Sequence, residues 1–389
     1  MNEGKYVFCQ LIAFLSKRVF DWIVQRYQGD KYVKDFTCWN QLLVMMCGQL
    51  SECGSLRELT DAVSAHRDSC YHLGFGKKPV SRSNLAYANE HRDYRIFEEM
   101  AYKMIAEAQR RRLDRIFTLH GRFYAVDSTT IDLCMSLFQW ALFRSQKAGI
   151  KMHTQFDVVT QIPTYFHITH AKMSDVKAMD ELPYEPGACY IFDRGYFDLE
   201  RLFRLELIGS DFVIREKRHL RYEVLEGSEL LDNDDNVIQD QTIRLKGVQT
   251  TAKYPAELRR IVYYSEEHGR TFTYLTNNFH INAADIAMLY KQRWQVELFF
   301  KWIKQHLHVK SYWGTSENAV RIQICTAIIS YCLIAIVEHD LKLGRSTFDV
   351  LRIIGHYLRV KVPVANLFKD IEPLYEPDPN QLQLELNFC

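Results

Sequence analysis

The sequence lacks the cysteine spacing of a zinc site or of a disulfide framework. Its 10 cysteines are scattered along 389 residues, and no Cys-x-x-Cys pair occurs. Scattered cysteines are typical of proteins whose thiols stay reduced, so we expect a cytoplasmic protein without structural zinc.

Long hydrophobic runs are also absent. The longest apolar stretch, residues 322–338, is too short and too interrupted to span a membrane, and it predicts a buried helix instead. The N-terminal residues lack the small-residue cleavage site of a secretory signal, and their pattern is that of an amphipathic helix. We therefore expect no membrane partner.

Net charge of either sign is nearly absent as well, since the formal net charge is +1. The charges are nevertheless uneven along the chain. Residues 1–120 and residues 290–321 each carry four more positive than negative side chains, whereas residues 363–389 carry four more negative ones. Local basic surfaces matter more than the total for binding nucleic acid, although this excess alone is a weak indication.

The first part of the chain, residues 1–119, has the apolar spacing of a helical domain. Two of its predicted helices are separated by a basic connection that contains glycine, and the second helix has Ser81 or Ser83 as its N-cap. Three polar side chains lie near the start of that helix: Arg82, Asn84 and Arg92. The arrangement is similar to a helix-turn-helix that reads DNA, and a helical packing domain with a polar face is the alternative.

From residue 120 the pattern changes to strands and helices, which is typical of an α/β fold. Residues 120–217 predict a buried strand that ends at Asp127, then a hairpin, then a strand that ends at Asp193. Ser174 and Asp198 are the expected N-caps of two short helices in this region.

Residues 218–276 contain several alternating runs and predict an inserted β-rich region. Its acidic segment at residues 232–236 lacks the glycine of a calcium loop and has the composition of a turn. Helical periodicity returns over residues 277–362. The acidic tail that follows, residues 363–389, is rich in proline and is expected to be poorly ordered.

The segment from residue 290 to residue 304 has the spacing of a two-sided helix. At roughly 100° per residue, four polar side chains fall in one narrow stripe beside a separate apolar face: Tyr290, Arg293, Glu297 and Lys304. The stripe is either a solvated edge with ordinary ion pairs or the polar edge of a functional site.

Three carboxylates can converge at one edge of the predicted sheet. Asp127 and Asp193 end two strands, and Glu297 lies on a helix whose apolar face would cover the same sheet. Carboxylates bind Mg²⁺, and two such ions activate a water and stabilise the leaving oxygen when a phosphodiester is cleaved. An Asp after a strand is often only a turn former. Other acidic residues compete for the role, Asp157 most seriously: Asp132, Asp157, Asp175 and Asp198.

Together these motifs resemble the DDE transposases of bacterial insertion sequences. The spacing Tyr-x2-Arg-x3-Glu-x6-Lys is similar to the signature of the family named IS-four, and "VDST" at Asp127 and "FDRGYF" at Asp193 resemble its other two acidic motifs. The resemblance implies an RNase H-like catalytic core interrupted by a β-rich insertion, with an N-terminal helical DNA-binding domain.

The resemblance also implies a role for each motif residue. Two Mg²⁺ ions, which Mn²⁺ can replace, would be bound by Asp127, Asp193 and Glu297. The DNA end would be held through phosphate contacts by Tyr290, Arg293 and Lys304. The protein would bind the terminal inverted repeats of its element, cleave the double-stranded ends and join their 3′-hydroxyls to target DNA. Pairing two ends implies at least a dimer in the synaptic complex, at the bacterial nucleoid.

One departure concerns base stacking. Some members of the family stack a flipped base on a Trp of the insertion, and residues 218–276 contain no Trp. Tyr263 or Tyr264 offers an aromatic face, although β-propensity favours a structural role for both. Two other functions stay open: an RNase H-like nuclease or resolvase without strand transfer, and a catalytically inactive DNA-binding regulator.

Overall fold

The computed structural model describes residues 4–113, 121–134, 136–144, 147–229, 236–306 and 312–369. The chain divides into two compact units, each assembled from separate stretches. Unit 1 comprises Met1–Asp114, Ile131–Gly149 and Phe300–Cys389, and unit 2 comprises Arg115–Thr130 and Ile150–Phe299. We predicted a helical domain, a core in two parts (residues 120–217 and 277–362) around an insertion, and a tail. These two units have other bounds, because helices from both ends of the chain share one core. Two predicted features, the acidic turn at 232–235 and the tail at 370–389, lie outside the described residues.

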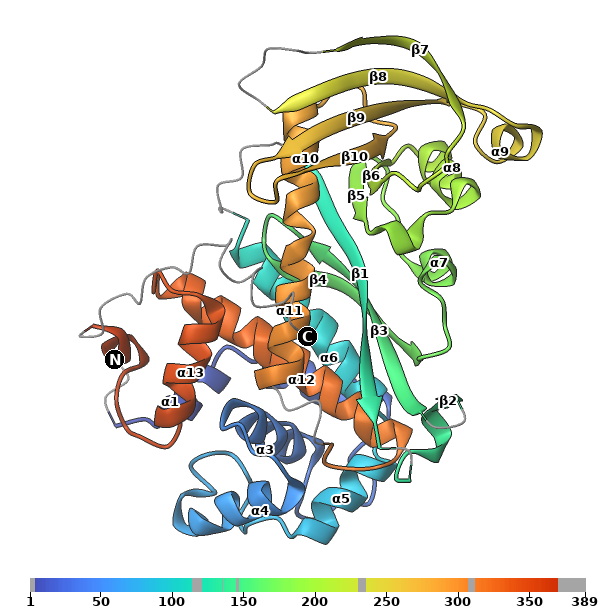
Figure 1. Ribbon diagram of the computed structural model, residues 1–389. Helices are drawn as coiled ribbons and strands as arrows, with labels where there is room; N and C mark the ends of the chain where they lie inside the picture. The colour runs from blue at the N-terminus through green and yellow to red at the C-terminus, as the bar shows by residue number, and fades with distance from the viewer. Residues whose placement is uncertain are drawn as a thin grey trace. The chain divides into compact units, whose positions relative to one another are not determined.

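Unit 1 is built around one long buried helix, α12 (Glu317–Asp340) (Figure 1). By length and composition this helix could cross a membrane, but 94% of its most apolar window is buried inside the protein. It packs against helices from both ends of the chain, and the prediction of a buried helix is confirmed. The other helices of unit 1 are α1 (Val7–Ile12), α2 (Lys17–Arg26), α3 (Cys38–Leu50), α4 (Leu56–Ala65), α5 (Arg82–His91), α6 (Arg95–Arg111) and α13 (Thr347–Tyr357).

A ten-stranded mixed sheet, most of it in unit 2, dominates the described part of the chain. Its order is β2-β3-β1-β5-β6-β10-β9-β8-β7, with β4 paired to β3. The strands are β1 (Arg122–Leu133), β2 (Leu142–Arg144), β3 (Lys147–Asp157), β4 (Ile162–His170), β5 (Ala188–Phe192), β6 (Asp211–Arg215), β7 (Tyr222–Glu229), β8 (Val237–Leu245), β9 (Glu257–Ser265) and β10 (Arg270–Thr276). The predicted mixed α/β fold is confirmed.

The centre of the sheet is parallel, because β5 pairs in parallel with both β1 and β6. Strand β5 is buried along its whole length, as expected for a parallel strand that is covered on both faces. The predicted β-rich insertion extends this sheet instead of forming a separate one, since β10 pairs antiparallel with β6. The predicted hairpin is also present, formed by β3 and β4.

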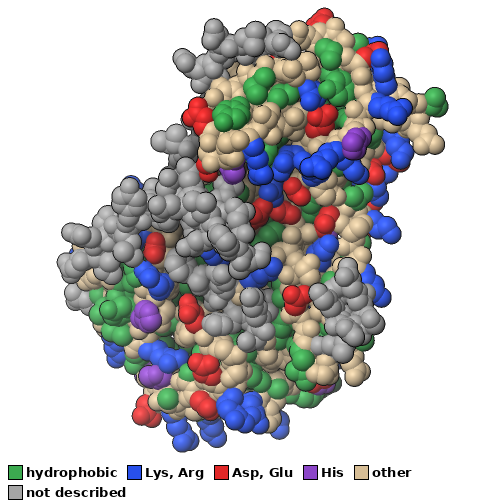
Figure 2. Space-filling model, viewed as in Figure 1, with side chains coloured by type: hydrophobic (Ala, Val, Ile, Leu, Met, Phe, Trp, Pro, Cys, Tyr) green, Lys and Arg blue, Asp and Glu red, His purple; other side chains and the backbone are tan. Residues whose placement is uncertain are grey.

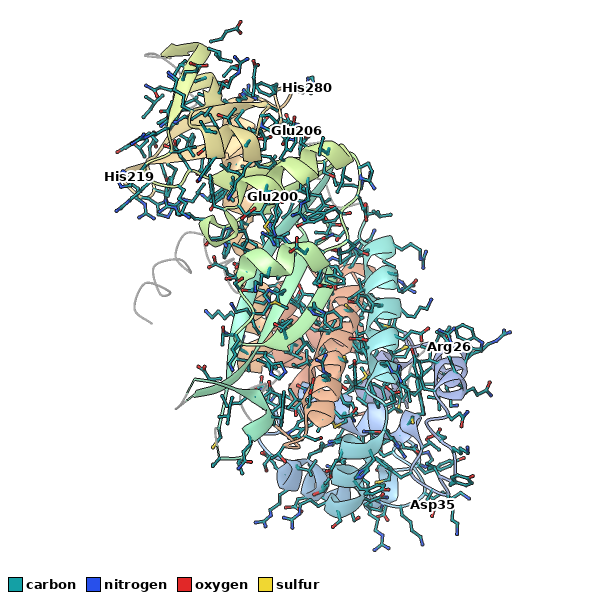
Figure 3. The ribbon with its side chains drawn as sticks, turned by 90° about the vertical axis from the view of Figure 1, so that its right-hand side faces the viewer. Arg26, Asp35, Glu200, Glu206, His219 and His280 are labelled. Atoms are coloured by element: carbon teal, nitrogen blue, oxygen red, sulfur yellow. The ribbon has the colours of Figure 1, made fainter. Side chains whose placement is uncertain are left out.

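Helices cover both faces of the sheet in unit 2 (Figure 1). They are α7 (Asp175–Ala178), α8 (Leu199–Ile208), α9 (Val248–Lys253), α10 (Ala283–Gln292) and the first part of α11 (Trp294–His306). Ser174 caps α7 and Asp198 caps α8, as predicted. Helix α9 was not predicted. Glu206 on α8 (Figure 3) accepts a hydrogen bond from Tyr254, which follows α9, so the inserted region is tied to the core helix.

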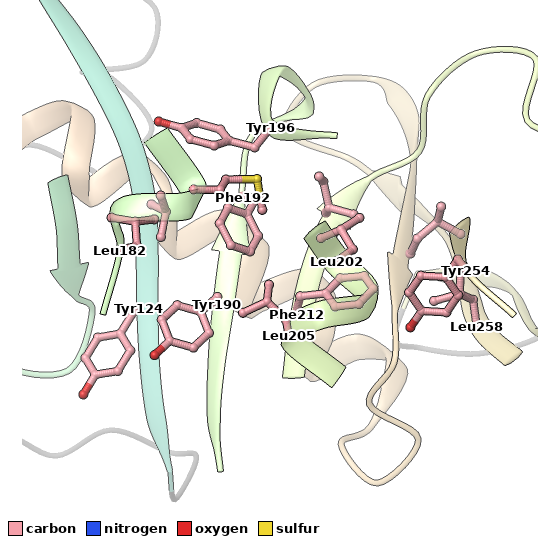
Figure 4. Packing of buried hydrophobic residues seen from close by; sticks show 14 of the residues in the cluster. Tyr124, Leu182, Tyr190, Phe192, Tyr196, Leu202, Leu205, Phe212, Tyr254 and Leu258 are labelled. Carbon is pink, nitrogen blue, oxygen red and sulfur yellow. The ribbon is translucent and has the colours of Figure 1, made fainter. Parts of the chain in front are cut away.

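The apolar core of unit 2 lies between the parallel strands and helix α8. Alternate residues of each strand point into it, among them Val126, Phe192 and Phe212, all completely buried (Figure 4). The residues between them, such as Ala125 and Val213, point to the opposite face. Asp127 follows Val126 in β1, so it belongs to that opposite face.

We expect Phe192→Ala to lower the free energy of unfolding by about 3–5 kcal/mol, because it empties the centre of this core. Val248→Ala is the control, since that side chain is 91% exposed and its loss should cost under about 0.5 kcal/mol. Urea denaturation followed by circular dichroism measures both, and equal stability of the two variants would contradict the assigned core.

Candidate active site

Two of the predicted acidic residues lie on neighbouring strands, directly after the point where the parallel pairing of the strands ends. The last paired residues of β1 and β5 are Val126 and Phe192, and Asp127 and Asp193 are the next residue of each strand. Strand β1 continues to Leu133, so the prediction that it ends at Asp127 is wrong. The parallel pairing with β5 ends at Val126, however, and this places the two carboxylates at one edge.

Arg293 connects two of the three carboxylates. It lies at the junction of α10 and α11, where the backbone stays helical. Its Nη1 donates to Asp127 Oδ2 at 2.8 Å, and its Nη2 donates to Glu297 Oε1 at 2.6 Å. Arg293 and Asp127 are separated by 166 positions in the chain, so the polar stripe is part of a tertiary site and not a solvated edge.

Burial has the largest single effect on the pKa values of Asp127 and Arg293. It raises the pKa of Asp127 to about 6, against the effect of the nearby Arg293 guanidinium, which favours the ionised form. Burial also opposes the charge of Arg293, but Asp127 and Glu297 together hold the pKa of that guanidinium above its ordinary value. Asp193 forms no ion pair with any described residue and accepts only the Gly195 N–H, at 3.4 Å. Arg293 thus pairs with two of the three acidic side chains.

The donor set has the chemistry of a magnesium site. Asp127, Asp193 and Glu297 offer carboxylate oxygens, which Mg²⁺ and Mn²⁺ prefer. Among the described residues no three potential ligands are already close enough to hold an ion. Between Asp127 and Glu297 the positive charge is at present supplied by Arg293.

The remaining residues of the stripe occupy different surroundings. Tyr290 is 8% exposed, its ring lies 4.7 Å from that of Tyr274, and the Arg293 guanidinium carbon lies 5.9 Å from its centre. Lys304 is half-buried on α11, seven residues beyond Glu297. The predicted apolar face is confirmed for Leu289, Val296, Phe299, Phe300 and Ile303, which are all buried.

The four acidic residues that competed for a place in the site have different surroundings in the structure. Asp157 accepts hydrogen bonds from Val159 and Thr160 and stabilises the turn after β3, so its role is local. Asp198 caps α8, and Asp132 is exposed. Asp175, in contrast, contacts Ser128, the neighbour of Asp127. No local pattern pairs residues 47 positions apart, so Asp175 was only one competitor among four in the sequence analysis.

The N-terminal candidates also differ from one another. Ser81 caps α5, and Arg82 and Asn84 are exposed on its first turn. Arg92 points inward: its Nη1 donates to Gln41 Oε1 at 2.9 Å, and its Nη2 donates to the Phe36 carbonyl. Burial lowers the pKa of Arg92, which is typical of a cation used to stabilise a core.

The inserted strands carry aromatic side chains on both faces. Tyr264 is 40% exposed, whereas Tyr263 is half-buried and pairs with Phe272 of β10. The guanidinium carbons of Arg215 and Arg270 lie 4.9 and 4.8 Å from the centre of the Phe272 ring. An aromatic ring next to two cations can stack on a nucleotide base, so Phe272 is a candidate besides Tyr263 and Tyr264. The sequence analysis did not identify Phe272.

Comparison with known proteins adds independent findings. The family described as "Transposase DDE domain" matches residues 119–333, and a domain of unknown function matches residues 3–76. The protein y4zB of Sinorhizobium fredii, named as a transposase, is 34% identical over 314 residues, which are 79% of this chain and 82% of that protein. A protein of Geobacillus stearothermophilus, named as the transposase of insertion sequence element IS5377, is 33% identical over 54% of this chain and 55% of its own length.

Two further comparisons are more distant. A protein of Synechocystis, named as the transposase of insertion sequence element IS4SA, is 25% identical over 80% of this chain and 88% of its own length. The solved structure of a piggyBac transposase synaptic complex with hairpin DNA has a TM-score of 0.46 at 10% identity, covering 99% of this chain and 85% of that one. At this score the likeness supports no conclusion about this chain.

Proposed function

Because the chain belongs to the family of transposases with a DDE domain, we propose that it binds the terminal inverted repeats of its own insertion sequence, cleaves the DNA ends and joins their 3′-hydroxyls to target DNA. One observation carries the proposal. Asp127 lies 166 positions from Arg293 in the chain, yet it meets Arg293 and the neighbouring Glu297 at the edge where Asp193 follows its strand. The central strands β3, β1, β5 and β6 would be the RNase H-like core.

The three carboxylates are the proposed ligands of two Mg²⁺ ions, which Mn²⁺ can replace. Bound there, the ions would lower the pKa of an attacking water or hydroxyl and neutralise the leaving oxygen of the phosphodiester. Asp127 and Asp193 would hold their oxygens in fixed positions, because Asp127 lies within β1 and Asp193 directly follows the buried β5. Glu297, whose side chain is 41% exposed, would approach from the helix.

Arg293 would change partners in this proposal. In the free protein its two terminal nitrogens form ion pairs with Asp127 and Glu297. When the ions take over that charge, the planar guanidinium can donate the same two hydrogen bonds to a DNA phosphate. Tyr290 and Lys304 are proposed to contact the same strand, as the resemblance implied.

Basic side chains near the site would receive the rest of the DNA strand. On the face shown in Figure 2, Lys and Arg side chains of unit 2 gather beside a group of Asp and Glu side chains. Arg215, Lys217, Arg218 and Arg270 form no ion pair with any described residue. Cations that are not committed to carboxylates are available to phosphates. The complete reaction needs two ends, so we propose at least a dimer on double-stranded DNA, at the nucleoid in the cytoplasm.

The test is cleavage of a labelled DNA fragment that carries the inverted repeat flanking this coding frame. We expect cutting at the repeat boundary with Mg²⁺ or Mn²⁺ and none with EDTA. A second labelled fragment serves as target, and covalent joining of the 3′ end to it distinguishes a transposase from a nuclease without strand transfer. Binding of the repeat without cutting, under conditions where two ends can pair, would contradict the proposal.

We propose that Arg82 and Asn84 contact the terminal repeat, since both are exposed at the start of α5. The double replacement by Ala should weaken binding of the repeat roughly 10-fold or more, at about 1–3 kcal/mol for each base-reading contact. Its thermal stability should be unchanged. Arg92→Ala should instead lower the unfolding temperature, because Gln41 and the Phe36 carbonyl lose their donor. Fluorescence anisotropy and thermal denaturation separate the two effects, and wild-type affinity of the double variant would remove α5 from the interface.

A further inference from the structure

A half-buried polar cluster adjoins Asp127. Side chains alternate across a strand, so Ser128 leaves β1 on the face opposite to Asp127. Ser128 Oγ donates to Asp175 Oδ1 at 2.5 Å, and Lys151 Nζ donates to the same oxygen at 3.2 Å. The Ser128 backbone N–H donates to Asp127 Oδ1 at 2.7 Å. The cluster is therefore connected to an acidic residue of the site through a single residue.

His153 completes the cluster from strand β3, where it is 1% exposed. Its Nε2 lies 3.1 Å from Thr169 Oγ1, and that hydroxyl already donates to the His170 carbonyl. Nε2 therefore carries the proton, and burial, which lowers the pKa of His153 to about 4, keeps the ring neutral. Nδ1 is left as a buried acceptor without a hydrogen-bond donor, 3.9 Å from Asp175 Oδ1. His153 Nδ1 and Asp175 Oδ1 are both acceptors, so a cation beside them is favourable. The Lys151 ammonium is that cation.

The Lys151 ammonium is held in place, but not all of its N–H donors have an acceptor among the described residues. It has three N–H donors, its side chain is 14% exposed, and within the described part of the chain only Asp175 accepts from it. Unused donors on a largely buried ammonium are costly unless an acceptor reaches them. Asp175 Oδ2 also lies 4.0 Å from the point that a Cβ on Gly195 would occupy, and Asp193 Oδ2 lies 3.8 Å from the same point. The cluster thus borders both Asp127, through Ser128, and Asp193.

We propose that Lys151 binds a phosphate oxygen of the DNA at the active site, and that Asp175, Ser128 and His153 are positioning residues that hold its ammonium. This inference rests on the proposed function, because its ligand is the phosphodiester. Lys151 and Asp175 are neutral as a pair, so the contact supplies directed hydrogen bonds instead of net charge. Lys151 contacts the DNA from one face of β1, and Asp127 and Arg293 lie on the opposite face.

Binding without catalysis tests the contact itself. The full-length protein is titrated in EDTA against a labelled duplex that ends at the repeat boundary, as a cleaved end does. We expect Lys151→Met to weaken binding roughly 10- to 100-fold, the size of a lost hydrogen bond to a charged group. Lys151→Arg should recover part of the affinity because it keeps charged N–H donors at this position. Lys177→Met is the matched control, since Lys177 is exposed on the neighbouring α7, and it should bind as the wild type does.

A double-mutant cycle tests the positioning role. With saturating Mg²⁺, Asp175→Asn should slow single-turnover cleavage about as much as Lys151→Met does, and the double variant should be no slower than either single one. Mn²⁺ binding by Asp175→Asn, measured by electron paramagnetic resonance, should equal that of the wild type. Additive losses, or weaker Mn²⁺ binding, would overturn the positioning role and make Asp175 a metal ligand.

The outcomes separate this inference from the proposed function. Wild-type affinity of Lys151→Met in EDTA would overturn the phosphate contact, even if cleavage by the wild type were fully established. Failure of the wild type to cut the fragment would instead refute the proposed function, and the affinities in EDTA would still decide whether Lys151 binds DNA.

Discussion

Asp127→Asn, Asp193→Asn and Glu297→Gln are each expected to abolish cleavage of the terminal-repeat DNA while leaving its binding nearly unchanged. Each amide keeps the size of the side chain but removes the charge that would hold a divalent cation, and we expect a loss of roughly 1,000-fold or more. Single-turnover cleavage of a labelled fragment measures the loss, and fluorescence anisotropy in EDTA measures binding.

Asp198→Asn is the matched control for these variants. Asp198 lies five residues after Asp193 and caps α8, and Asn is an equally good N-cap, so activity should stay at the wild-type level. Cleavage by any of the three amide variants at more than a few per cent of the wild-type rate would remove that residue from the site. Loss of DNA binding together with cleavage would show that the residue supports the fold.

Arg293→Gln is expected to lower the free energy of unfolding in EDTA by about 3–5 kcal/mol, the usual cost of leaving buried charges without their partner. Asp127 and Glu297, whose side chains are 18% and 41% exposed, would face each other without a cation. Glu297 is the more exposed of the two, so most of the cost should come from Asp127. Urea denaturation in EDTA measures the change.

The same variant should bind Mn²⁺ at least about tenfold more tightly than the wild type, because no guanidinium competes for Asp127 and Glu297. Saturating Mn²⁺ should therefore stabilise Arg293→Gln more than it stabilises the wild type. Cleavage should nevertheless fall, since the proposed phosphate contact is lost. Electron paramagnetic resonance reports the Mn²⁺ affinity, and thermal denaturation with and without Mn²⁺ reports the stabilisation.

Arg260→Gln provides the control for a buried ion pair in the same unit. Arg260 and Glu216 are 14% and 15% exposed and lie 3.2 Å apart, far in the chain from the acidic motifs. This variant should lose stability as well, but Mn²⁺ should not restore it. If the two arginine variants responded alike to Mn²⁺, Arg293 would be an ordinary structural cation and the proposed exchange of partners would be wrong.

Local sequence patterns predicted most elements of unit 2. The hairpin of β3 and β4, the strand that precedes Asp193 and the cap at Ser174 depend on alternation and on turn or cap residues a few positions away. The stripe that joins Arg293 to Glu297 is equally local, since residues four apart share a helix face. The end of β1 was predicted wrongly, because the strand continues past Asp127 although its pairing with β5 ends at Val126.

Local sequence patterns could not predict the tertiary contacts that give these side chains their roles. Arg92 has the position of a DNA contact in its helix, yet it points into the core and holds α3. Asp157 and Asp175 were both alternatives to the three candidate acidic residues. Only their hydrogen-bond partners show that Asp157 stabilises a turn, whereas Asp175 contacts Ser128 beside Asp127. Residues 1–119 looked like a domain of their own, but α12 joins them to the C-terminal helices.

The sequence by itself indicated the family, most strands and helices of unit 2 and three candidate acidic positions, because these depend on spacing and periodicity along the chain. Only the tertiary structure decided that Arg293 is the cation of Asp127 and that Lys151 is held by Asp175 beside the same strand end. The physical reason is that the pairing of β1 with β5 and the packing of α10 and α11 on the sheet bring together residues too far apart for any local pattern to connect.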